Sequence, residues 1–403
     1  MTNELDKIFE AFDRNGIFKN KSLLQNNYRP EDIPHRSKEI KQIASILAPV
    51  LRGERASNLF LYGNPGTGKT LLINYIKEEL LKRVKKDADF KLNIEYLNCK
   101  LKKVSDTEYR ILAELIKKFG GKVPATGLPT HSVYEKFIET IDQEKQLVVL
   151  ILDEIDQTTK KISDDFLYNL TRLNSELSKT QICLVGISNN LTFLDEIDPR
   201  VKSSLSEEEV VFDPYNALQL QDILTKRAKE VFREGVMQEG VIAKCSALAA
   251  REHGDARRAL DLLRIAGELA ERDGSKKIFL KYIDEANEKI EKDKILDVIT
   301  SEPKQFQMVL DAIIKLSEKH PSSSIFTGDV YNLYRDICLK NHLEILTQRR
   351  VGDIIQQFDM LGIINVRVIS KGRGGRMREI KLAINKEIIE KAKEIVSDSL
   401  SYK

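Results

Sequence analysis

Apolar residues follow two patterns in the first half of the chain. Four short apolar runs, NLFLYG, FKLNIEYLNC, QLVVLILDE and QICLVGIS, lie between about Leu59 and Phe212, and amphipathic segments separate them. Short buried runs predict strands, and apolar residues three or four positions apart predict helices. Strands that alternate with helices are typical of a parallel sheet covered on both faces. The pattern therefore predicts an α/β fold.

The pattern changes twice further along the chain. From about Asn216 to Asp293 it is wholly helical, and from about Ile299 three helices precede the strand INVRVIS, the loop KGRGGRM and the strand REIKLAI. The second arrangement predicts a helix-turn-helix domain with a β-hairpin, a winged helix. We predict an N-terminal arm over 1–27, an α/β core over 28–214, a helical lid over 215–297 and a winged helix over 298–403. For the predicted helix ELDKIFEAFDRN in the arm, there are two alternatives: it packs against its own domain, or it recruits a partner.

Composition narrows the class of protein only slightly. The 65 Lys and Arg nearly balance the 62 Asp and Glu, giving a net charge of +3, so local charge must indicate partners. No apolar run approaches the roughly 20 residues that span a bilayer, so we expect a soluble, cytoplasmic protein without a membrane partner. The four cysteines lack paired spacing, which argues against a disulfide framework or a zinc site.

The segment between the first strand and the next helix has the chemistry of a phosphate site. GNPGTGKT fits the pattern G-x-x-x-x-G-K-[ST], with a strand before it and a helix after it. Glycines let successive backbone N–H groups face one anion, the lysine adds a positive charge, and the threonine hydroxyl is suited to Mg²⁺. A glycine-rich turn with a chance lysine is the alternative. The site residues are Gly63, Gly66, Thr67, Gly68, Lys69 and Thr70, and the ligands are ATP or ADP with Mg²⁺.

Polar residues follow two later strands. QLVVLILDEID delivers Asp153 and Glu154 at the carboxyl end of a buried strand, where Asp153 is placed for Mg²⁺ and Glu154 for polarising a water. The next strand, QICLVGISNN, ends at Asn189, a neutral donor suited to that water or to the γ phosphate. A turn-capping role is the alternative for Asn189.

The third helix of the C-terminal domain is predicted to read DNA. LTQRRVGDIIQQFDMLGII starts from the capping residue Thr347, and its polar side presents arginine and glutamine, which pair with guanine and adenine edges. The expected buried residues are Val351, Ile354, Ile355, Phe358 and Leu361, and the expected exposed ones are Gln348, Arg349, Asp353 and Gln356.

The following hairpin is the densest basic stretch of the chain. Its glycines allow close approach to a groove, with Arg373 and Arg376 available to the minor groove. A solvated charged hairpin is the alternative, and many winged helices bind protein instead. The basic residues are Arg367, Lys371, Arg373, Arg376, Arg378 and Lys381, against the one acid Glu379.

Four motifs in this order, GNPGTGKT, LILDEID, VGISNN and GDARRAL, resemble those of AAA+ ATPases. With YRPEDIPHR before the core, DPRVKSSLSEEEVVFDPY after it and the basic winged helix, the chain resembles the archaeal origin-recognition and cell-division-control family of replication initiators. The resemblance extends from about Tyr28 to Ile384. It implies an ATP-dependent initiator that binds double-stranded origin DNA, works with related initiator subunits, and helps recruit the replicative helicase near the nucleoid, with nucleotide state as a switch.

The resemblance also assigns roles to further residues. Asn189 would be the first sensor, and Arg257 in GDAR the second, reaching from the lid to the γ phosphate. Arg200 falls where relatives carry an arginine facing a neighbour's nucleotide, although Ser204 departs from the arginine found in eukaryotic relatives, and we expect slow hydrolysis. Residues implied to border the nucleotide are Ile33, Pro34, Tyr215 and Arg227.

An insertion between the second strand and LVVLILDE carries a further expectation. In the family, helical material at this place contacts duplex DNA, and here Lys122, Thr126 and Thr130 would touch phosphates. An ordinary crossover helix with a long loop is the alternative. Two other functions also fit the motifs: an AAA+ motor or loader with sustained turnover on DNA, and a signalling ATPase that binds only proteins.

Overall fold

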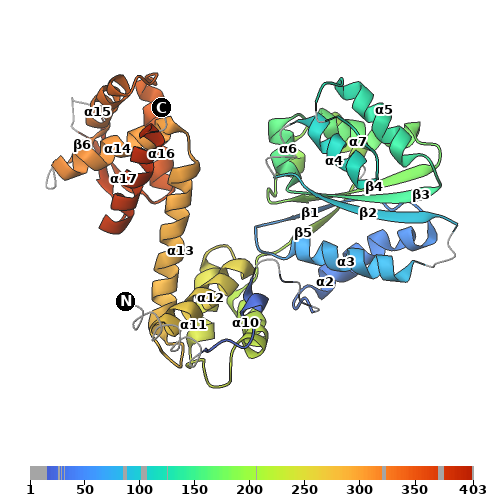
Figure 1. Ribbon diagram of the computed structural model, residues 1–403, viewed down its shortest axis with the longest axis horizontal. Coiled ribbons are helices and arrows are strands. Elements are labelled where there is room, and N and C mark those ends of the chain that lie inside the picture. Colours follow the sequence, from blue (N-terminus) through green and yellow to red (C-terminus); the bar gives the residue numbers. More distant parts are fainter. Residues whose placement is uncertain are drawn as a thin grey trace, which may run out of the picture. The chain divides into compact units, whose positions relative to one another are not determined.

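The computed structural model describes most of the chain as two compact units. The described residues are 16–25, 28, 30, 32–84, 89–100, 107–124, 126–205, 207–319, 324–370 and 376–401. The helix predicted in ELDKIFEAFDRN lies outside them. The two units meet between Ile283 and Asp284 in the sequence, and each is described by itself (Figure 1). In the part of the chain that is described, no helix combines the length and the apolar character needed to cross a membrane.

A parallel sheet forms the centre of the first unit. Its strands are β1 (Asn58–Gly63), β2 (Lys91–Asn98), β3 (Gln146–Asp153), β4 (Thr180–Ser188) and β5 (Glu207–Phe212), in the order β2-β3-β4-β1-β5. The apolar runs predicted the first four. The edge strand β5 was not predicted as a strand, because EEEVVF opens with three acids, and it is held by pairing with β1 from Asn58↔Glu207 to Gly63↔Phe212.

Strand β3 shows why both faces of the sheet are covered. Leu147, Val149 and Ile151 belong to a core shared with α2 (Ser37–Leu47) and α3 (Lys69–Arg83). The intervening residues Val148, Leu150 and Leu152 belong to the opposite core, because successive side chains of a strand point to opposite faces. Figure 1 shows the two helix layers. The second layer contains α4 (Glu108–Lys118), α5 (Thr130–Ile141) and α7 (Asp165–Glu176), and the shorter helices near it are α6 (Ile155–Lys161), α8 (Phe193–Glu196) and α9 (Pro199–Leu205).

Asp142 fixes the entry into β4. Its carboxylate accepts backbone N–H groups from Ser178, Lys179 and Thr180 at 2.8–2.9 Å. Burial alone would raise the pKa of Asp142, but the three donors together outweigh it and lower the pKa. The ionised form therefore stabilises the fold.

Asp142→Asn is expected to lower the free energy of unfolding by about 1–2 kcal/mol at neutral pH, because an amide offers only one acceptor oxygen. Since the folded-state pKa is lowered, the contribution is complete above the unfolded carboxyl pKa of about 3.9 and is lost as the pH falls through the folded value. Urea titrations of both proteins at several pH values measure this. The control is Glu176→Gln, which makes the same kind of change at an exposed acid. A difference that does not narrow below about pH 4 would contradict the role of the charge.

The lid of the first unit is helical and also contacts the described part of the arm. Asn216 caps the first lid helix through a reciprocal capping box with Gln219. Lys19 donates its backbone N–H to Val231, and Arg233 donates to Ile17. The arm therefore packs along the end of this helix. The lid helices are α10 (Ala217–Val231), α11 (Val241–Arg251) and α12 (Ala256–Arg272), and α13 (Leu280–Ser301) follows.

The second unit has the predicted winged-helix fold. It contains α14 (Lys304–Lys319), β6 (Ile325–Phe326), α15 (Thr327–Lys340), α16 (Gln348–Met360), β7 (Ile364–Ser370), β8 (Arg376–Leu382) and α17 (Lys386–Ser401). The three strands form an antiparallel sheet in the order β6-β8-β7. Neither the two-residue β6 nor α17 was predicted.

Helix α16 buries the residues that its spacing predicts, with one exception. Val351, Ile354, Ile355 and Phe358 are buried, and the Phe358 ring lies 4.2 Å from the ring of Phe306 between centroids. The prediction for Leu361 was wrong: it caps the helix and is 39% exposed, because the chain turns at this point instead of continuing the helical spacing.

Candidate nucleotide site and nucleic-acid interface

The glycine-rich loop joins β1 to α3, and its backbone conformation favours glycine. Gly66 and Gly68 have φ values of 73° and 94°, in the left-handed region. A Cβ on Gly66 would lie 1.7 Å from Asp255 Oδ1, so the loop excludes larger residues there. The loop is thus shaped as an anion cradle in front of a helix N-terminus.

Lys69 is the first residue of α3 and is buried behind this loop. Its Nζ donates to the carbonyl oxygens of Gly63 (2.7 Å) and Asn64 (2.9 Å), and to Oδ1 of Asn189 (2.9 Å). Burial lowers the pKa of Lys69 to about 8; Asp153 opposes this shift, and the charge of Arg257 adds to it. The ammonium therefore links the phosphate loop to the end of β4.

Thr70 and Asp153 bring two oxygens together beside the loop. Thr70 Oγ1 donates to Asp153 Oδ2 at 2.8 Å, and the Tyr96 hydroxyl donates to the same oxygen at 2.6 Å. Burial raises the pKa of Tyr96, which keeps this donor protonated. Mg²⁺ prefers oxygen ligands and usually takes one or two carboxylates together with phosphates. Thr70 and Asp153 fit that preference.

Glu154 follows in a strained conformation. Its φ and ψ are 56° and 43°, in the left-handed region, which non-glycine residues rarely adopt. Its backbone N–H donates to Asp153 Oδ1 at 2.9 Å, and its carboxylate lies 3.4 Å from Lys100 Nζ.

Asn189 is oriented by a buried carboxylate that the sequence did not single out. Asp156 accepts the Ser188 hydroxyl at 3.3 Å and the Asn189 backbone N–H at 3.4 Å. Asp156 itself is only 3% exposed. It holds the end of β4 so that the Asn189 side chain meets Lys69.

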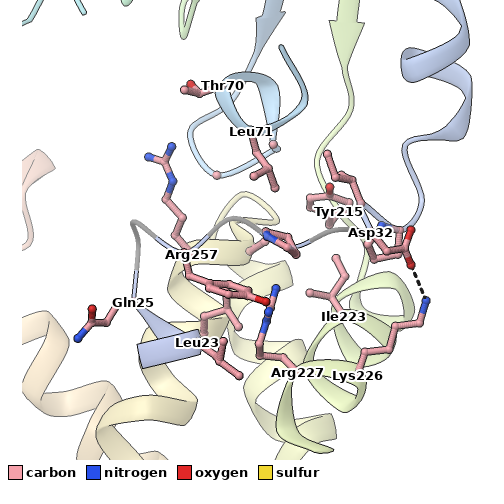
Figure 2. Close-up of a pocket in the computed structure, with 18 of the residues that line it drawn as sticks. Leu23, Gln25, Asp32, Thr70, Leu71, Tyr215, Ile223, Lys226, Arg227 and Arg257 are labelled. Carbon is pink, nitrogen blue, oxygen red and sulfur yellow. Dashed lines mark hydrogen bonds and ion pairs between the residues drawn. The ribbon is translucent and has the colours of Figure 1, made fainter. Parts of the chain in front are cut away.

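A cavity of about 830 Å³ opens between the phosphate loop and the lid, both in the first unit. This volume is within the range of about 300–1,000 Å³ usual for small-molecule sites. Figure 2 shows the Arg257 side chain extending from the lid toward the helix that carries Thr70. Predicted residues that line the cavity are Ile33, Pro34, Gly66, Gly68, Thr70, Tyr215, Arg227 and Arg257. The other predicted residues are not part of its wall. Contacts given above join Gly63, Lys69, Asp153, Glu154 and Asn189 to one another and to Thr70, and the Thr67 hydroxyl donates to the Asn64 carbonyl at 2.8 Å within the loop.

Arg227 forms part of this wall together with Tyr28, which the sequence did not assign. The Arg227 guanidinium carbon lies 4.4 Å from the centre of the Tyr28 ring, and Nη1 lies 3.4 Å from Glu230. The Arg227 Nε is buried without a hydrogen-bond partner among the described residues. A buried donor without an acceptor beside a cavity fits a polar ligand.

Arg200, at the start of α9, is exposed and paired within its own turn. Its guanidinium donates to both carboxylate oxygens of Asp198, at 3.1 and 2.9 Å. This pairing lowers the pKa of Asp198 to about 2. The trans-acting role of Arg200 stays a prediction, and it requires the arginine to exchange this partner.

The residues predicted to contact DNA fall in two described places. Gln348, Arg349 and Gln356 are exposed on α16 of the second unit, and the Thr347 hydroxyl caps that helix as predicted. In the first unit, Lys122, Thr126 and Thr130 are exposed along the connection from α4 to the first residue of α5. Lys371 and Arg373 lie outside the described residues, and Arg376 begins β8 without a described side chain.

Three family models match consecutive parts of the chain. Residues 52–194 match an AAA domain, residues 221–288 match the Cdc6 AAA+ ATPase-type lid domain, and residues 297–392 match the CDC6 C-terminal winged helix domain. The curated relatives extend over almost the same length. The chain is 50% identical to an ORC1-type DNA replication protein of Pyrococcus furiosus over 386 residues, covering 94% of this chain and 91% of that protein.

A second relative and a solved structure agree with this result. ORC1-type DNA replication protein 1 of Sulfurisphaera tokodaii is 45% identical over 393 residues, 97% of this chain and 96% of that protein. The structure of the Aeropyrum pernix ORC1 protein in complex with DNA is 40% identical with a TM-score of 0.82, covering 96% of this chain and 98% of that one. The chain therefore belongs to the family of ORC1-type DNA replication proteins, which is the family that its motifs predict.

Proposed function

We propose that the protein is an ATP-dependent replication initiator that binds double-stranded origin DNA. The observation that carries the proposal is the exposed polar side of α16. Arg349 and Gln356 are exposed there, while the apolar residues of the same helix are buried in the core of the winged helix. Arginine and glutamine are the side chains suited to guanine and adenine edges in the major groove. The solved Aeropyrum pernix relative was bound to DNA, which supports this assignment.

We further propose that bound ATP or ADP sets the conformation of the first unit. Arg257 is the second residue of α12, and its side chain extends from the lid into the cavity (Figure 2). Its positive charge contributes to lowering the pKa of Lys69. An arginine on the lid senses a γ phosphate because closure gains a charge-assisted contact only when that phosphate is present. Nucleotide occupancy then favours one lid position.

Mg²⁺ would be held by Thr70 and Asp153, whose oxygens lie 2.8 Å apart. When bound, it would neutralise charge on the phosphates. Tyr96 holds the Asp153 carboxylate and Lys69 supplies a positive charge at the loop. We assign Glu154, which follows Asp153, to orienting a water. Hydrolysis by this set of residues would end the ATP state.

Recruitment of the replicative helicase and assembly with related initiator subunits are proposed from the family alone. Arg200, exposed on α9, is the residue we assign to a neighbour's nucleotide. Lys122, Thr126 and Thr130 are assigned to phosphates of the same duplex, with the exposed connection before α5 in support. A protein with these partners acts on the chromosome.

The double variant Arg349→Ala, Gln356→Ala is expected to lose about 30-fold to ten-thousand-fold of its preference for origin DNA over unrelated duplex. Each base contact contributes about 1–3 kcal/mol of discrimination, while binding to any duplex depends mainly on phosphate contacts. Footprinting on genomic fragments, with affinities at several salt concentrations, measures both quantities.

Two further variants test whether that loss is specific to α16. Lys391→Ala removes one exposed charge from α17 and is expected to leave the footprint unchanged. Arg373→Ala, Arg376→Ala in the wing is expected to reduce the salt slope by roughly 2 without a comparable loss of discrimination. Equal discrimination by wild type and the α16 variant would contradict the proposed reading helix. No binding by wild type would favour the signalling ATPase, and rapid DNA-stimulated hydrolysis would favour a motor or loader.

A further inference from the structure

Arg36 is a buried arginine to which the sequence motifs assign no role. It precedes α2 and is only 4% exposed, although arginine is rarely buried without partners. Each edge of its guanidinium donates to a different place: Nε to the Thr67 carbonyl at 3.1 Å, Nη1 to Glu39 at 2.8 Å and Nη2 to the Asp213 carbonyl at 2.6 Å. Glu39, itself buried, balances the charge.

The two carbonyl partners belong to segments with different tasks. Thr67 is in the phosphate loop, one residue before Gly68. Asp213 follows the last residue of β5 and lies in the short connection that leads into the lid helix α10. One side chain therefore holds the backbone of the phosphate loop and the backbone of the connection to the lid.

The flat face of the guanidinium contacts the same connection. Its carbon lies 4.1 Å from the centre of the Tyr215 ring and 5.4 Å from that of Phe212. Contacts of this kind between arginine and aromatic rings are favourable, and more so when they are shielded from water. Tyr215 also lines the cavity, so Arg36 stacks on a residue of the cavity wall.

The connection is in turn tied to the lid residues nearest the phosphate loop. The Tyr215 backbone N–H donates to Gly254 at 3.3 Å, and a Cβ on Gly254 would lie 2.4 Å from the Tyr215 carbonyl oxygen. The next residues return to the loop, since the Ala256 N–H donates to the Gly66 carbonyl at 3.3 Å. The contacts form a closed ring from the phosphate loop through Arg36 and Tyr215 to the start of α12, and back.

We propose that Arg36 is the positioning residue that couples the phosphate loop to the lid. The inference rests on the proposed function, in which nucleotide occupancy controls the lid. A shift of the Thr67 carbonyl reaches Asp213 and Tyr215 through one rigid group, and from there reaches the loop that carries Asp255 and Arg257. Coupling of this kind requires a contiguous element that both sites bias, and the guanidinium provides it.

Lysine is not an adequate replacement at this position. An ammonium is a point charge on a flexible stem, whereas the guanidinium is a planar fork that donates along fixed directions and stacks on rings. Arg36→Lys keeps the charge beside Glu39 but cannot reach Thr67 and Asp213 together while stacking on Tyr215. This variant separates coupling from charge.

The test measures the lid position by energy transfer between dyes on the full-length chain. The dyes are attached to cysteines introduced by Glu139→Cys on α5 and Ala247→Cys on α11, both exposed positions. The four native cysteines are buried, so they compete little for the dyes. The probes are ADP and a non-hydrolysable ATP analogue, each added at concentrations that saturate the variant under study, with binding followed separately by a fluorescent nucleotide.

In Arg36→Lys the nucleotide-driven shift in the ratio of the two lid positions, obtained from the transfer efficiency, is expected to shrink about fivefold or more, the lower end of usual couplings between sites. Glu39→Gln keeps the side-chain shape but weakens the hold on Nη1, and it is expected to give a smaller reduction in the same direction. Arg52→Lys, at an exposed arginine that forms a two-point pair with Glu54, is the matched control and is expected to respond like wild type.

The outcomes separate the role of Arg36 from the proposed nucleotide switch on which it depends. A full lid response at saturating nucleotide in Arg36→Lys and Glu39→Gln, even with lower thermal stability, would overturn the inference and leave the switch intact. No response in wild type despite measured binding would overturn the switch, and the coupling role with it. A reduced response at full nucleotide occupancy would support Arg36 as the coupling residue.

Discussion

Lys69→Ala is expected to abolish retention of ATP, with a loss of affinity of about 30-fold to several thousand-fold. Removing one member of a buried, hydrogen-bonded charge pair costs about 2–5 kcal/mol in general. In this chain the loss has a second cause, because Nζ also ties the carbonyls of Gly63 and Asn64 to Asn189. The variant loses the charge that we assign to the phosphates and the contacts that hold the loop to Asn189.

Filter binding or a fluorescent nucleotide measures this effect directly. Lys82→Ala is the matched control, since it removes an exposed lysine from the same helix, where Lys82 pairs with Glu79. It is expected to bind ATP as wild type does. Retention of ATP by Lys69→Ala at the wild-type level would refute the phosphate site and, with it, the nucleotide switch.

Glu154→Gln is expected to bind ATP normally and to hydrolyse it about 10²- to 10⁴-fold more slowly. A positioned carboxylate that accepts a proton typically contributes a factor of this size. The amide keeps the shape of the side chain and leaves the backbone contact with Asp153 in place, so the loop and the Thr70–Asp153 pair are unaffected.

Single-turnover measurements give the hydrolysis rate independently of release. Glu144→Gln changes an exposed acid just before β3 that pairs with Lys91, and it is expected to leave the rate unchanged. A wild-type rate in Glu154→Gln would assign the water-orienting role to another residue. The variant is also a tool, because it holds the ATP state for footprinting.

The parts of this molecule that follow a local rule were predictable from its sequence. The phosphate loop has a fixed spacing with glycine at constrained backbone positions, and β3 is a run of apolar residues long enough to exclude a surface strand. The capping Thr347 and the spacing of Val351, Ile354, Ile355 and Phe358 placed the buried side of α16 correctly. In each case the deciding interactions lie within a few residues of one another.

The features that sequence reasoning missed depend on contacts between distant residues. Strand β5 has an acidic beginning and is a strand because β1 supplies its hydrogen bonds. Tyr28 contacts Arg227, which is far away in the sequence. Nothing in the sequence distinguishes Arg36 from a surface arginine, because its partners Thr67 and Asp213 come close only in the fold. The motif YRPEDIPHR includes both Tyr28 and Arg36, but its sequence does not show which charged side chain is buried and which is exposed.

The contact between the start of α12 and the glycine loop has a kinetic consequence. The Ala256 N–H bonds to Gly66, and the Asp255 carboxylate fills the space over that glycine. We expect a nucleotide seated between the loop and the lid to leave more slowly when this bond and the packing around it must first come apart. Its residence time would then follow the frequency of that opening, so product left by one hydrolysis would stay bound far longer than a diffusive encounter lasts.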